Sequence, residues 1–281
     1  MKQETFDCEP TLTDTQVLDF CKNGFLLLES VVPDEINSRA LEYCDANPST
    51  EPSAILEEDW FAENVITNPA AAGAVRSLLG ANVHLPVLMS NHRRQSTYKA
   101  QGGWHVDGNY VYTPALNYLQ VFYYPQDTPI ELGPTQIVPG THLVRNQARF
   151  MYNLGSIRGM MPTAAPAGSI FVTVYSIWHR TGTCTSDETR NLLKYFYWRT
   201  TPPMRDWVVE PDFDFATADY RSPVAQFFEQ CRDQVKVAEM FLWLCGEHEK
   251  FQDLGGQSWP LHANRLGPAY GFPQGLDSNS F

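Results

Sequence analysis

The stretch PAGSIFVTVYSIWHRTGTCTSDETRNLLKYFYWR, residues 166–199, holds two long apolar runs separated by a polar loop. Runs rich in Val, Ile, Phe and Tyr that lie between turn residues are typical of buried strands. We therefore expect strands at Ser169–Ile177 and Asn191–Thr200. The loop between them suits antiparallel neighbours, so Arg190 can lie near His179.

More short strands of the same character precede this stretch. Glycine and proline mark the turns between them, as in Gly133–Pro134 and Pro139–Gly140. Many short strands without alternating helices favour an antiparallel sandwich or barrel. The further strands are expected at Pro86–Asn91, Gly103–Asp107, Leu116–Tyr124 and Thr135–Val138.

Helical patterns flank this β-rich core of residues 86–204, and we expect a single domain over residues 1–281. Near the amino end, Thr13 or Asp14 can cap a helix that ends at Gly24. A strand at Phe25–Leu28 and helices over residues 34–43 and 68–79 are expected to follow. In residues 205–281, Ser222–Gly246 is predicted as a long helix, and this extension is expected to form a lid over the barrel mouth.

Composition indicates a globular protein, since 43% of the 281 residues are hydrophobic and 13% are aromatic. The formal net charge of −12 argues against nucleic acid or an anionic membrane as the main partner. The six cysteines form no CxxC pair, the amino end shows no signal-peptide pattern, and no apolar run reaches membrane-spanning length. We therefore expect a cytoplasmic protein with reduced thiols and a small-molecule substrate.

A histidine and an aspartate stand two residues apart in GGWHVDGNYVY, residues 102–112. Side chains alternate across a strand, so His105 and Asp107 point to the same face and can hold one metal ion. On its own, such a pair is more typical of a surface contact or of a hydrogen-bonded strand histidine. A metal site therefore needs a third ligand from elsewhere in the chain.

That third ligand is predicted to be His179, which follows an apolar run and lies eleven residues before Arg190. Two histidines and one carboxylate on one face of a β-barrel are the ligand set of non-haem Fe(II) oxygenases. Arg190 can then bind the far carboxylate of a 2-oxo diacid, because its planar fork matches a carboxylate. A salt bridge with Asp187 or Glu188 is the structural alternative. The remaining histidines are expected to be structural: His84, His92, His142, His248 and His262.

Four segments, in order, resemble the phytanoyl-CoA dioxygenase (PhyH) family of Fe(II)/2-oxoglutarate-dependent oxygenases. VLDFCKNGFLLLESVVPDEIN resembles the opening helix–strand–helix of the family, and WHVDGNY resembles its W-H-x-D motif. ELGPTQIVPGTHL resembles its hairpin, and the stretch quoted first resembles its ending, with the same spacing between histidine and arginine. The resemblance spans roughly residues 12–200 and implies a double-stranded β-helix, the cupin-like jelly roll.

The resemblance also implies roles for single residues. His105, Asp107 and His179 would bind Fe(II), and Arg190 would bind the 5-carboxylate of 2-oxoglutarate with help from Thr181. The 1-carboxylate would be met by a polar residue before the H-x-D motif, for which the candidates are Asn91 and Gln95.

Two positions depart from the family pattern, and neither is a metal ligand. Val106 replaces a common Gln, and the usual Asn of the distal loop is replaced around Cys184–Thr185. Asp107 is retained, whereas related halogenases carry Gly or Ala there. The intact carboxylate therefore favours hydroxylation or another oxidation over halogenation.

The resemblance implies a dioxygenase that uses O2 and 2-oxoglutarate to oxidise a C–H bond, with release of succinate and CO2. We expect hydroxylation of a small metabolite, such as an intermediate of natural-product biosynthesis, near Trp104, Tyr110 and Tyr112. The acidic charge is mild evidence against a CoA thioester, although an acyl-CoA hydroxylase stays open. So do a cupin-like metal-binding protein without oxygenase activity and a zinc hydrolase.

Overall fold

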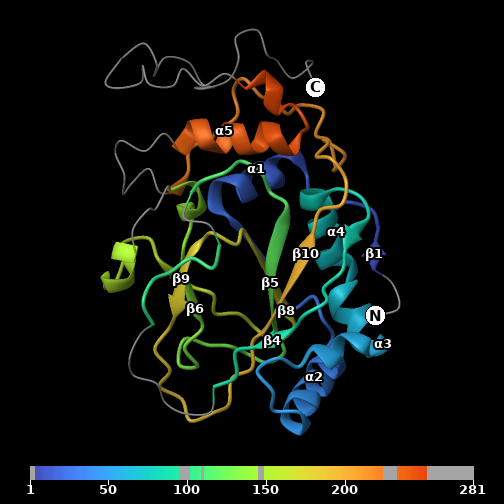
Figure 1. Ribbon diagram of the computed structural model, residues 1–281, viewed down its shortest axis with the longest axis vertical. Helices are drawn as coiled ribbons and strands as arrows, with labels where there is room; N and C mark the ends of the chain where they lie inside the picture. Colours follow the sequence, from blue (N-terminus) through green and yellow to red (C-terminus); the bar gives the residue numbers. More distant parts are fainter. Residues whose placement is uncertain (1–3, 95–101, 109–110, 145–148, 224–232, 252–281) are drawn as a thin grey trace.

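Two antiparallel sheets face each other in the computed structural model, which describes residues 4–94, 102–108, 111–144, 149–223 and 233–251 (Figure 1). The larger sheet has the order β1 (Thr5–Phe6), β3 (Val83–His84), β10 (Leu193–Trp198), β5 (Tyr118–Tyr124), β8 (Ser169–Thr173) and β2 (Phe25–Leu28), and β4 (Ser90–Asn91) also pairs with β10. The smaller sheet has the order β7 (Met161–Pro162), β6 (Thr135–Val138) and β9 (Trp178–Thr181). The predicted jelly roll with flanking helices is confirmed.

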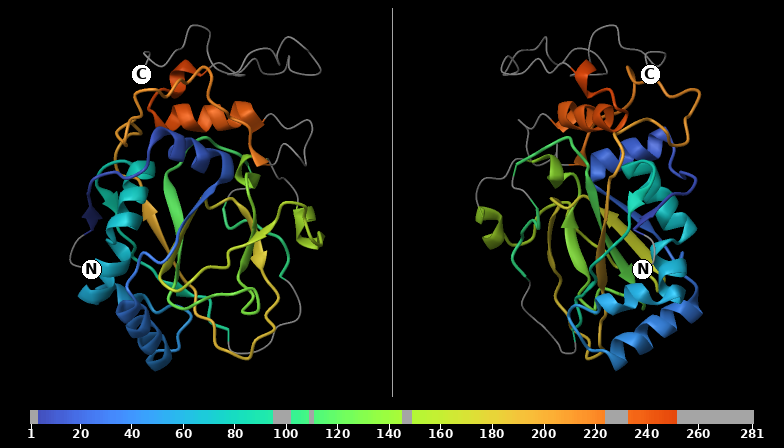
Figure 2. Two further views of the ribbon diagram at one scale, coloured as in Figure 1. Left: turned by 180° about the vertical axis from the view of Figure 1, so that it is seen from behind. Right: turned by 45° about the vertical axis from the view of Figure 1, so that its right-hand side comes forward.

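Helices cover the side of the larger sheet that faces away from the smaller one. Figure 1 shows α2, α3 and α4 along that side, and the views in Figure 2 show α1 and α5 together at one end of the barrel. The helices are α1 (Asp14–Asn23), α2 (Asp34–Ala46), α3 (Asp59–Phe61), α4 (Pro69–Leu79) and α5 (Asp233–Leu244), with short helical turns at Ser53–Glu57, Ala62–Ile66, Thr141–Leu143, Arg149–Asn153 and His248–Lys250. No helix among the described residues has the length and apolar character needed to span a membrane.

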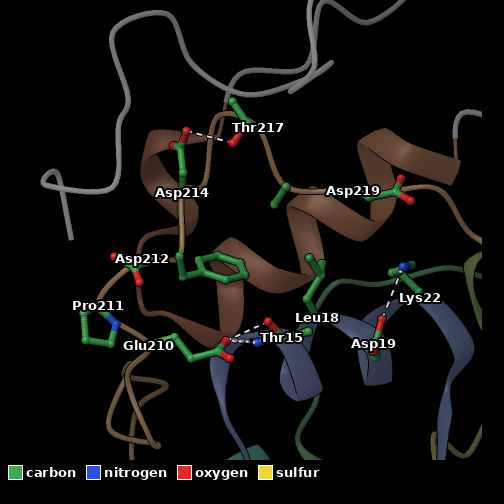
Figure 3. Close-up of a pocket in the computed structure, with 12 residues that line it drawn as sticks. Thr15, Leu18, Asp19, Lys22, Glu210, Pro211, Asp212, Asp214, Thr217 and Asp219 are labelled. Carbon is green, nitrogen blue, oxygen red and sulfur yellow. Dashed lines mark hydrogen bonds and ion pairs between the residues drawn. The ribbon is translucent and has the colours of Figure 1, made fainter.

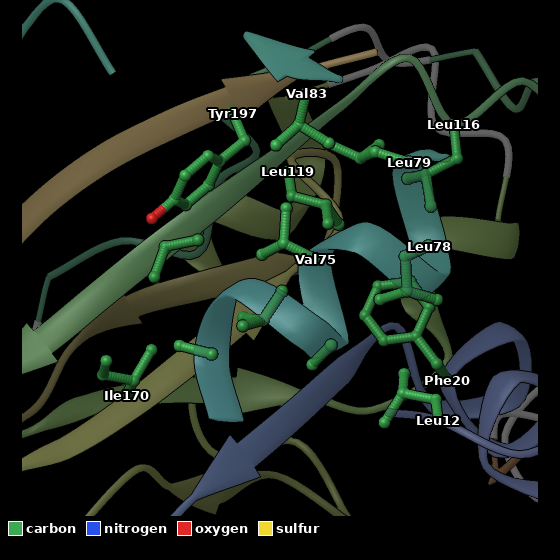
Figure 4. Close-up of a cluster of buried hydrophobic side chains, with 14 of the residues drawn as sticks. Leu12, Phe20, Val75, Leu78, Leu79, Val83, Leu116, Leu119, Ile170 and Tyr197 are labelled. Carbon is green, nitrogen blue, oxygen red and sulfur yellow. The ribbon is translucent and has the colours of Figure 1, made fainter. Parts of the chain in front are cut away.

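Strand alternation divides the larger sheet into two buried faces. On β5, Leu119 and Val121 point outward to the helices, and Figure 4 shows α4 side chains such as Val75 and Leu78 beside that face. Phe122, from the same strand, points inward and packs with Phe171 of β8 between the two sheets. The inner face therefore surrounds the space in which a ligand of the jelly roll would lie.

The amino-terminal helix begins and ends where the sequence predicts. The Thr13 side chain accepts a hydrogen bond from the Gln16 backbone, and the Gln16 side chain accepts one from the Thr13 backbone. Gly24 ends the helix with a φ of 80°, and a β-carbon there would lie 2.4 Å from Nδ1 of buried His142. Gly24 therefore serves both the left-handed turn and close packing.

Asp14, the other predicted cap, joins α1 to the carboxy-terminal extension instead. Its buried carboxylate accepts two hydrogen bonds of 2.8 Å from the Arg205 guanidinium. It also accepts hydrogen bonds from Trp207 Nε1 and from the Glu210 backbone, both at 2.7 Å. The extension is thus tied to α1 by a buried ion pair, and its role as a lid stays a prediction.

The predicted strand Ser169–Ile177 is wrong in one respect, because it contains the end of one strand and a turn into the next. β8 ends at Thr173, and the Ile177 backbone donates to the Val174 carbonyl in a tight turn before β9 starts at Trp178. His179 therefore lies near the start of a strand in the smaller sheet, and not at the end of an apolar strand. Both strands are buried, so apolar character continues through the change of sheet.

Other boundaries also differ from the predictions. The segment Pro86–Asn91 is extended only at β4, and Gly103–Asp107 forms a single bridge, in which His105 pairs with His179. The second helix continues beyond the predicted residue 43 to Ala46. In the predicted helix Ser222–Gly246, residues 224–232 lie outside the described residues, and the observed helix α5 covers only Asp233–Leu244.

Candidate metal and cosubstrate site

His105, Asp107 and His179 lie together on the inner face of the barrel, where the His105 side chain is partly exposed. The backbones of His105 and His179 exchange two hydrogen bonds of 3.0 Å, which places the two imidazole rings 4.3 Å apart. Each of the three residues offers one ligand atom, and these atoms lie within 4.8 Å of one another. This spacing suits a single metal ion, and among the described residues this is the one such cluster.

The two imidazole rings present the same nitrogen to the centre of the cluster. Nδ1 of His105 donates to the Gly103 carbonyl at 2.9 Å, and Nδ1 of His179 donates to the Ile177 carbonyl at 3.0 Å. These bonds leave Nε2 of each ring facing Asp107, at 3.7 Å and 3.5 Å from its two carboxylate oxygens. Carbonyl partners on Nδ1 keep Nε2 free as a metal ligand.

Asp107 is held by two further groups on the larger sheet. Lys194 Nζ and Gln120 Nε2 each donate to Asp107 Oδ2 at 3.0 Å. Burial alone would raise the pKa of the Asp107 carboxyl, but His179 and the Lys194 ammonium outweigh burial and hold that pKa well below its usual range. Burial and the neighbouring His179 lower the pKa of His105. The cluster therefore offers a carboxylate and neutral imidazole, the forms that bind metals.

Arg190 is a buried cation without a carboxylate partner among the described residues. Its guanidinium donates to the carbonyls of Gly133 and His92, and its Nε is buried with no hydrogen-bond acceptor. Burial and the nearby Arg94 lower the pKa of Arg190 to about 10. The alternative salt bridge with an acid of its own loop, which the structure describes throughout, is therefore absent. A buried guanidinium in this state is suited to an anionic ligand.

Thr181 lies where the family pattern expects a hydroxyl. It follows His179 by two residues on β9, so both side chains point to the inner face. Thr181 pairs with Thr135, and Gly133, which accepts from Arg190, lies two residues before that pair. The Arg190 guanidinium is thus at the Thr181 end of β9.

The candidates for the 1-carboxylate are placed less favourably. The buried Asn91 amide donates to Asn191 Oδ1 at 2.9 Å and accepts from the Leu192 backbone at 3.2 Å. Both ends of this amide are used within the protein, so it has a structural role here. Gln95 lies outside the described residues.

Among the predicted substrate residues, Trp104 does not line the site. Trp104 is fully buried behind the smaller sheet, where its Nε1 donates to the Gly155 carbonyl at 2.8 Å. Alternation explains this placement, because Trp104 and the adjacent His105 point to opposite faces. The Tyr112 hydroxyl donates to the Lys236 carbonyl of α5, and Tyr110 lies outside the described residues.

Three residues near the cluster were not predicted from the sequence. Lys194 and Gln120 are single polar residues in the apolar strands LKYFYW and YLQVFYY, and that contrast was the available signal. His92 was predicted to be structural, yet its pKa is shifted by four ionisable groups of the site, Lys194, Arg190, Asp107 and His179. The residue as a whole is exposed, but burial of its ring and the cations Lys194 and Arg190 lower the pKa of His92 to about 4.

A separate cavity of about 610 Å³ lies between α1 and residues 210–219 (Figure 3). Its lining is acidic, and several of its charged groups already have partners within the protein. Glu210 accepts two hydrogen bonds from Thr15, and Lys22 pairs with Asp19 at 3.2 Å. None of the residues that line this cavity belongs to the cluster of His105, Asp107 and His179.

A jelly roll with two histidines and a carboxylate clustered at its mouth is the architecture of non-haem iron oxygenases. The chain belongs to the phytanoyl-CoA dioxygenase (PhyH) family, whose model matches residues 20–192. The resemblance drawn from the four motifs is thereby confirmed, as are the enzyme class and its cofactors: this is a non-haem iron enzyme that uses 2-oxoglutarate and O2.

Solved structures share the fold at low sequence identity. HygX from Streptomyces hygroscopicus, solved with nickel and 2-oxoglutarate bound, is 15% identical with a TM-score of 0.56, over 70% of this chain and 90% of HygX. The epimerase SnoN from nogalamycin biosynthesis is 16% identical with a TM-score of 0.54, over 67% and 84% of the two chains. The carbocyclase SnoK is 15% identical with a TM-score of 0.51, over 72% and 91%. No curated protein matches the chain by sequence.

Proposed function

We propose that this enzyme hydroxylates a C–H bond of a small organic metabolite, with release of succinate and CO2. The observation that carries the proposal is the pairing of a three-ligand cluster with a buried arginine that has no carboxylate partner among the described residues. Such a pair provides for a metal with open coordination positions and for a dicarboxylic cosubstrate. A zinc hydrolase has no use for the buried Arg190.

His105, Asp107 and His179 are proposed as the iron ligands. The donor set fits the ion, since it combines one carboxylate with two imidazoles whose Nε2 atoms face that carboxylate. Bound iron would supply the activation of oxygen. The protein orients the ligands through carbonyls on both rings and through the two donors on Asp107.

Arg190 is proposed to bind the 5-carboxylate of 2-oxoglutarate, together with the Thr181 hydroxyl. The buried Nε without an acceptor supports this role, because a carboxylate would satisfy it and neutralise the charge. His92, whose backbone carbonyl accepts from Arg190, is proposed as a further polar contact for the cosubstrate.

Hydroxylation is proposed over halogenation because Asp107 supplies a carboxylate ligand. The similar folds include an epimerase and a carbocyclase from nogalamycin biosynthesis, so this architecture supports other oxidative outcomes as well. The biosynthetic role of these two enzymes supports a role in natural-product biosynthesis here. We further propose that residues 1–281 act as one domain and that the protein is cytoplasmic, which the free state of the five described cysteines supports.

The test is substrate-dependent release of succinate by protein loaded anaerobically with Fe(II) and 2-oxoglutarate and then exposed to oxygen. In a panel of metabolites and acyl-CoA thioesters, we expect a free metabolite to stimulate release. His105→Ala and Asp107→Ala should abolish it, whereas His248→Ala, a histidine at the surface near α5, should not. Wild-type turnover in either site variant would contradict the proposal.

The same preparation separates the competing functions. A cupin-like protein without oxygenase activity would show no 2-oxoglutarate binding in calorimetry with Mn(II) under argon. A hydrolase would recover activity with Zn(II) and not with Fe(II). Stimulation by acyl-CoA thioesters alone would favour an acyl-CoA hydroxylase.

A further inference from the structure

Four half-buried aromatic side chains form a continuous wall on the inner face beside the metal-ligating cluster. They are Tyr118 of β5, Tyr175 of the turn after β8, and Phe196 and Trp198 of β10. Ring centroids lie 5.4 Å apart from Tyr118 to Tyr175, 5.3 Å from Tyr175 to Phe196, and 6.1 Å from Phe196 to Trp198. We call these four residues the aromatic wall.

The wall starts at the metal-ligating cluster. Lys194, which donates to Asp107, lies 6.0 Å from the Phe196 ring. Gly108 follows Asp107, and a β-carbon there would lie 2.8 Å from the Tyr175 ring, so that ring packs directly on the backbone beside the metal ligand. A molecule lying on the wall would therefore have one edge at the open coordination positions.

The aromatic wall is not part of the hydrophobic core. None of its four residues belongs to the buried clusters of the described chain, whereas their neighbours Tyr195 and Tyr197 on the opposite face of β10 are buried in one. Among the described residues, neither the Tyr118 nor the Tyr175 hydroxyl makes a hydrogen bond. The buried Tyr123, Tyr124, Tyr197 and Tyr220 do, although buried Tyr195 does not; the Tyr123 hydroxyl, for example, donates to Asn37 at 2.7 Å. Partly exposed rings with free hydroxyls are typical of a binding surface.

We propose that the aromatic wall binds the substrate, and that the substrate is a flat, conjugated ring system with oxygen substituents. Ring faces attract flat ligands by stacking and edge-to-face contact, and the two hydroxyls can bond to oxygens at the ligand's rim. An acyl-CoA thioester fits poorly, because its phosphates need several cations, and Lys194 beside the wall already pairs with Asp107. This inference rests on the proposed function for the location of the reacting edge.

The test compares two ligands with the same carbon skeleton, flat 2,6-dihydroxynaphthalene and saturated decahydronaphthalene-2,6-diol. Their binding is measured by calorimetry on protein loaded with Zn(II) and 2-oxoglutarate, which does not turn over. We expect the flat ligand to bind at least about tenfold more tightly than the saturated one, as several aromatic contacts would give. Equal affinity, or no binding of the flat ligand, would overturn the inference.

Variants locate the binding surface. Tyr175→Leu and Phe196→Leu should each weaken binding of the flat ligand about threefold to tenfold. Tyr43→Leu, which removes an equally half-buried tyrosine from α2, should leave binding unchanged. Loading with metal and 2-oxoglutarate is measured first: failure to load contradicts the proposed function, whereas normal loading without preference for the flat ligand contradicts only this inference.

Discussion

The inner face of the barrel has two ends that are built from the same strands. Apolar side chains pack together at one end, and polar side chains surround the cluster at the other. At the closed end, Phe122, Phe171 and Leu192 are fully buried against one another between the sheets. Two positions away from Phe122 and Leu192 on the same face, the side chains point to Asp107 instead. These are Gln120 of β5 and Lys194 of β10. A jelly roll can carry charged and half-exposed groups at one end because the other end supplies packing.

The comparison is tested most strongly by removing one phenylalanine from each end. Phe171 stacks on Phe25 at 5.2 Å and is 1% exposed, so Phe171→Ala should lower the free energy of unfolding by about 3–5 kcal/mol. Phe196 is half-buried in the aromatic wall, so Phe196→Ala should lower it by less than about 2 kcal/mol. Urea denaturation of the metal-free variants measures both, and equal losses would show that the two ends do not differ in this way.

The second prediction concerns the buried charge of Arg190, which lies on the far side of Leu192 from Lys194, near Tyr124. Arg190→Leu should weaken 2-oxoglutarate binding by roughly 100-fold or more, because a buried charged hydrogen-bond partner is removed. Binding of Mn(II) should change little, since the arginine does not contact the cluster ligands. Calorimetry with Mn(II) and then 2-oxoglutarate measures the two steps, and Arg158→Leu, at an exposed arginine, serves as the control. Loss of Mn(II) binding would mean that Arg190 supports the cluster and not the cosubstrate.

The residues of the cluster could be predicted because their arrangement follows from short-range rules. His105 and Asp107 share a face through strand alternation, and the spacing from His179 to Arg190 belongs to one loop. The same alternation places Trp104 on the face opposite to His105, so the burial of Trp104 could also be predicted from the sequence. Strand alternation therefore argues against Trp104 as a substrate-binding residue.

Other features depend on pairing between distant strands, which a single sequence does not contain. The turn at residues 174–177 joins two buried strands without Gly or Pro, so hydrophobicity continues through it. Lys194 and Gln120 are visible as polar residues in apolar strands, but their common partner Asp107 lies on a third segment. The aromatic wall likewise arises from β5, β10 and a turn that meet only in the folded chain.

The smallest expected effect separates hydrogen bonding from charge at Asp107. Gln120 and Lys194 both donate to Oδ2 at 3.0 Å, but only Lys194 places a positive charge next to the metal position. Gln120→Leu should weaken Mn(II) binding about tenfold, because the carboxylate loses a group that orients it. Lys194→Met loses a similar bond but also removes the repulsion between the ammonium and the bound cation.

Binding of Mn(II) to Lys194→Met should therefore stay within about threefold of the wild type, tighter than to Gln120→Leu. Titration of the metal-free proteins by calorimetry measures both, and Lys22→Met on α1 controls for net charge. If Lys194→Met were instead the weaker binder, orientation by Lys194 would outweigh its charge. The polar end would then depend on the ammonium for geometry, just as the closed end depends on its phenylalanines for packing.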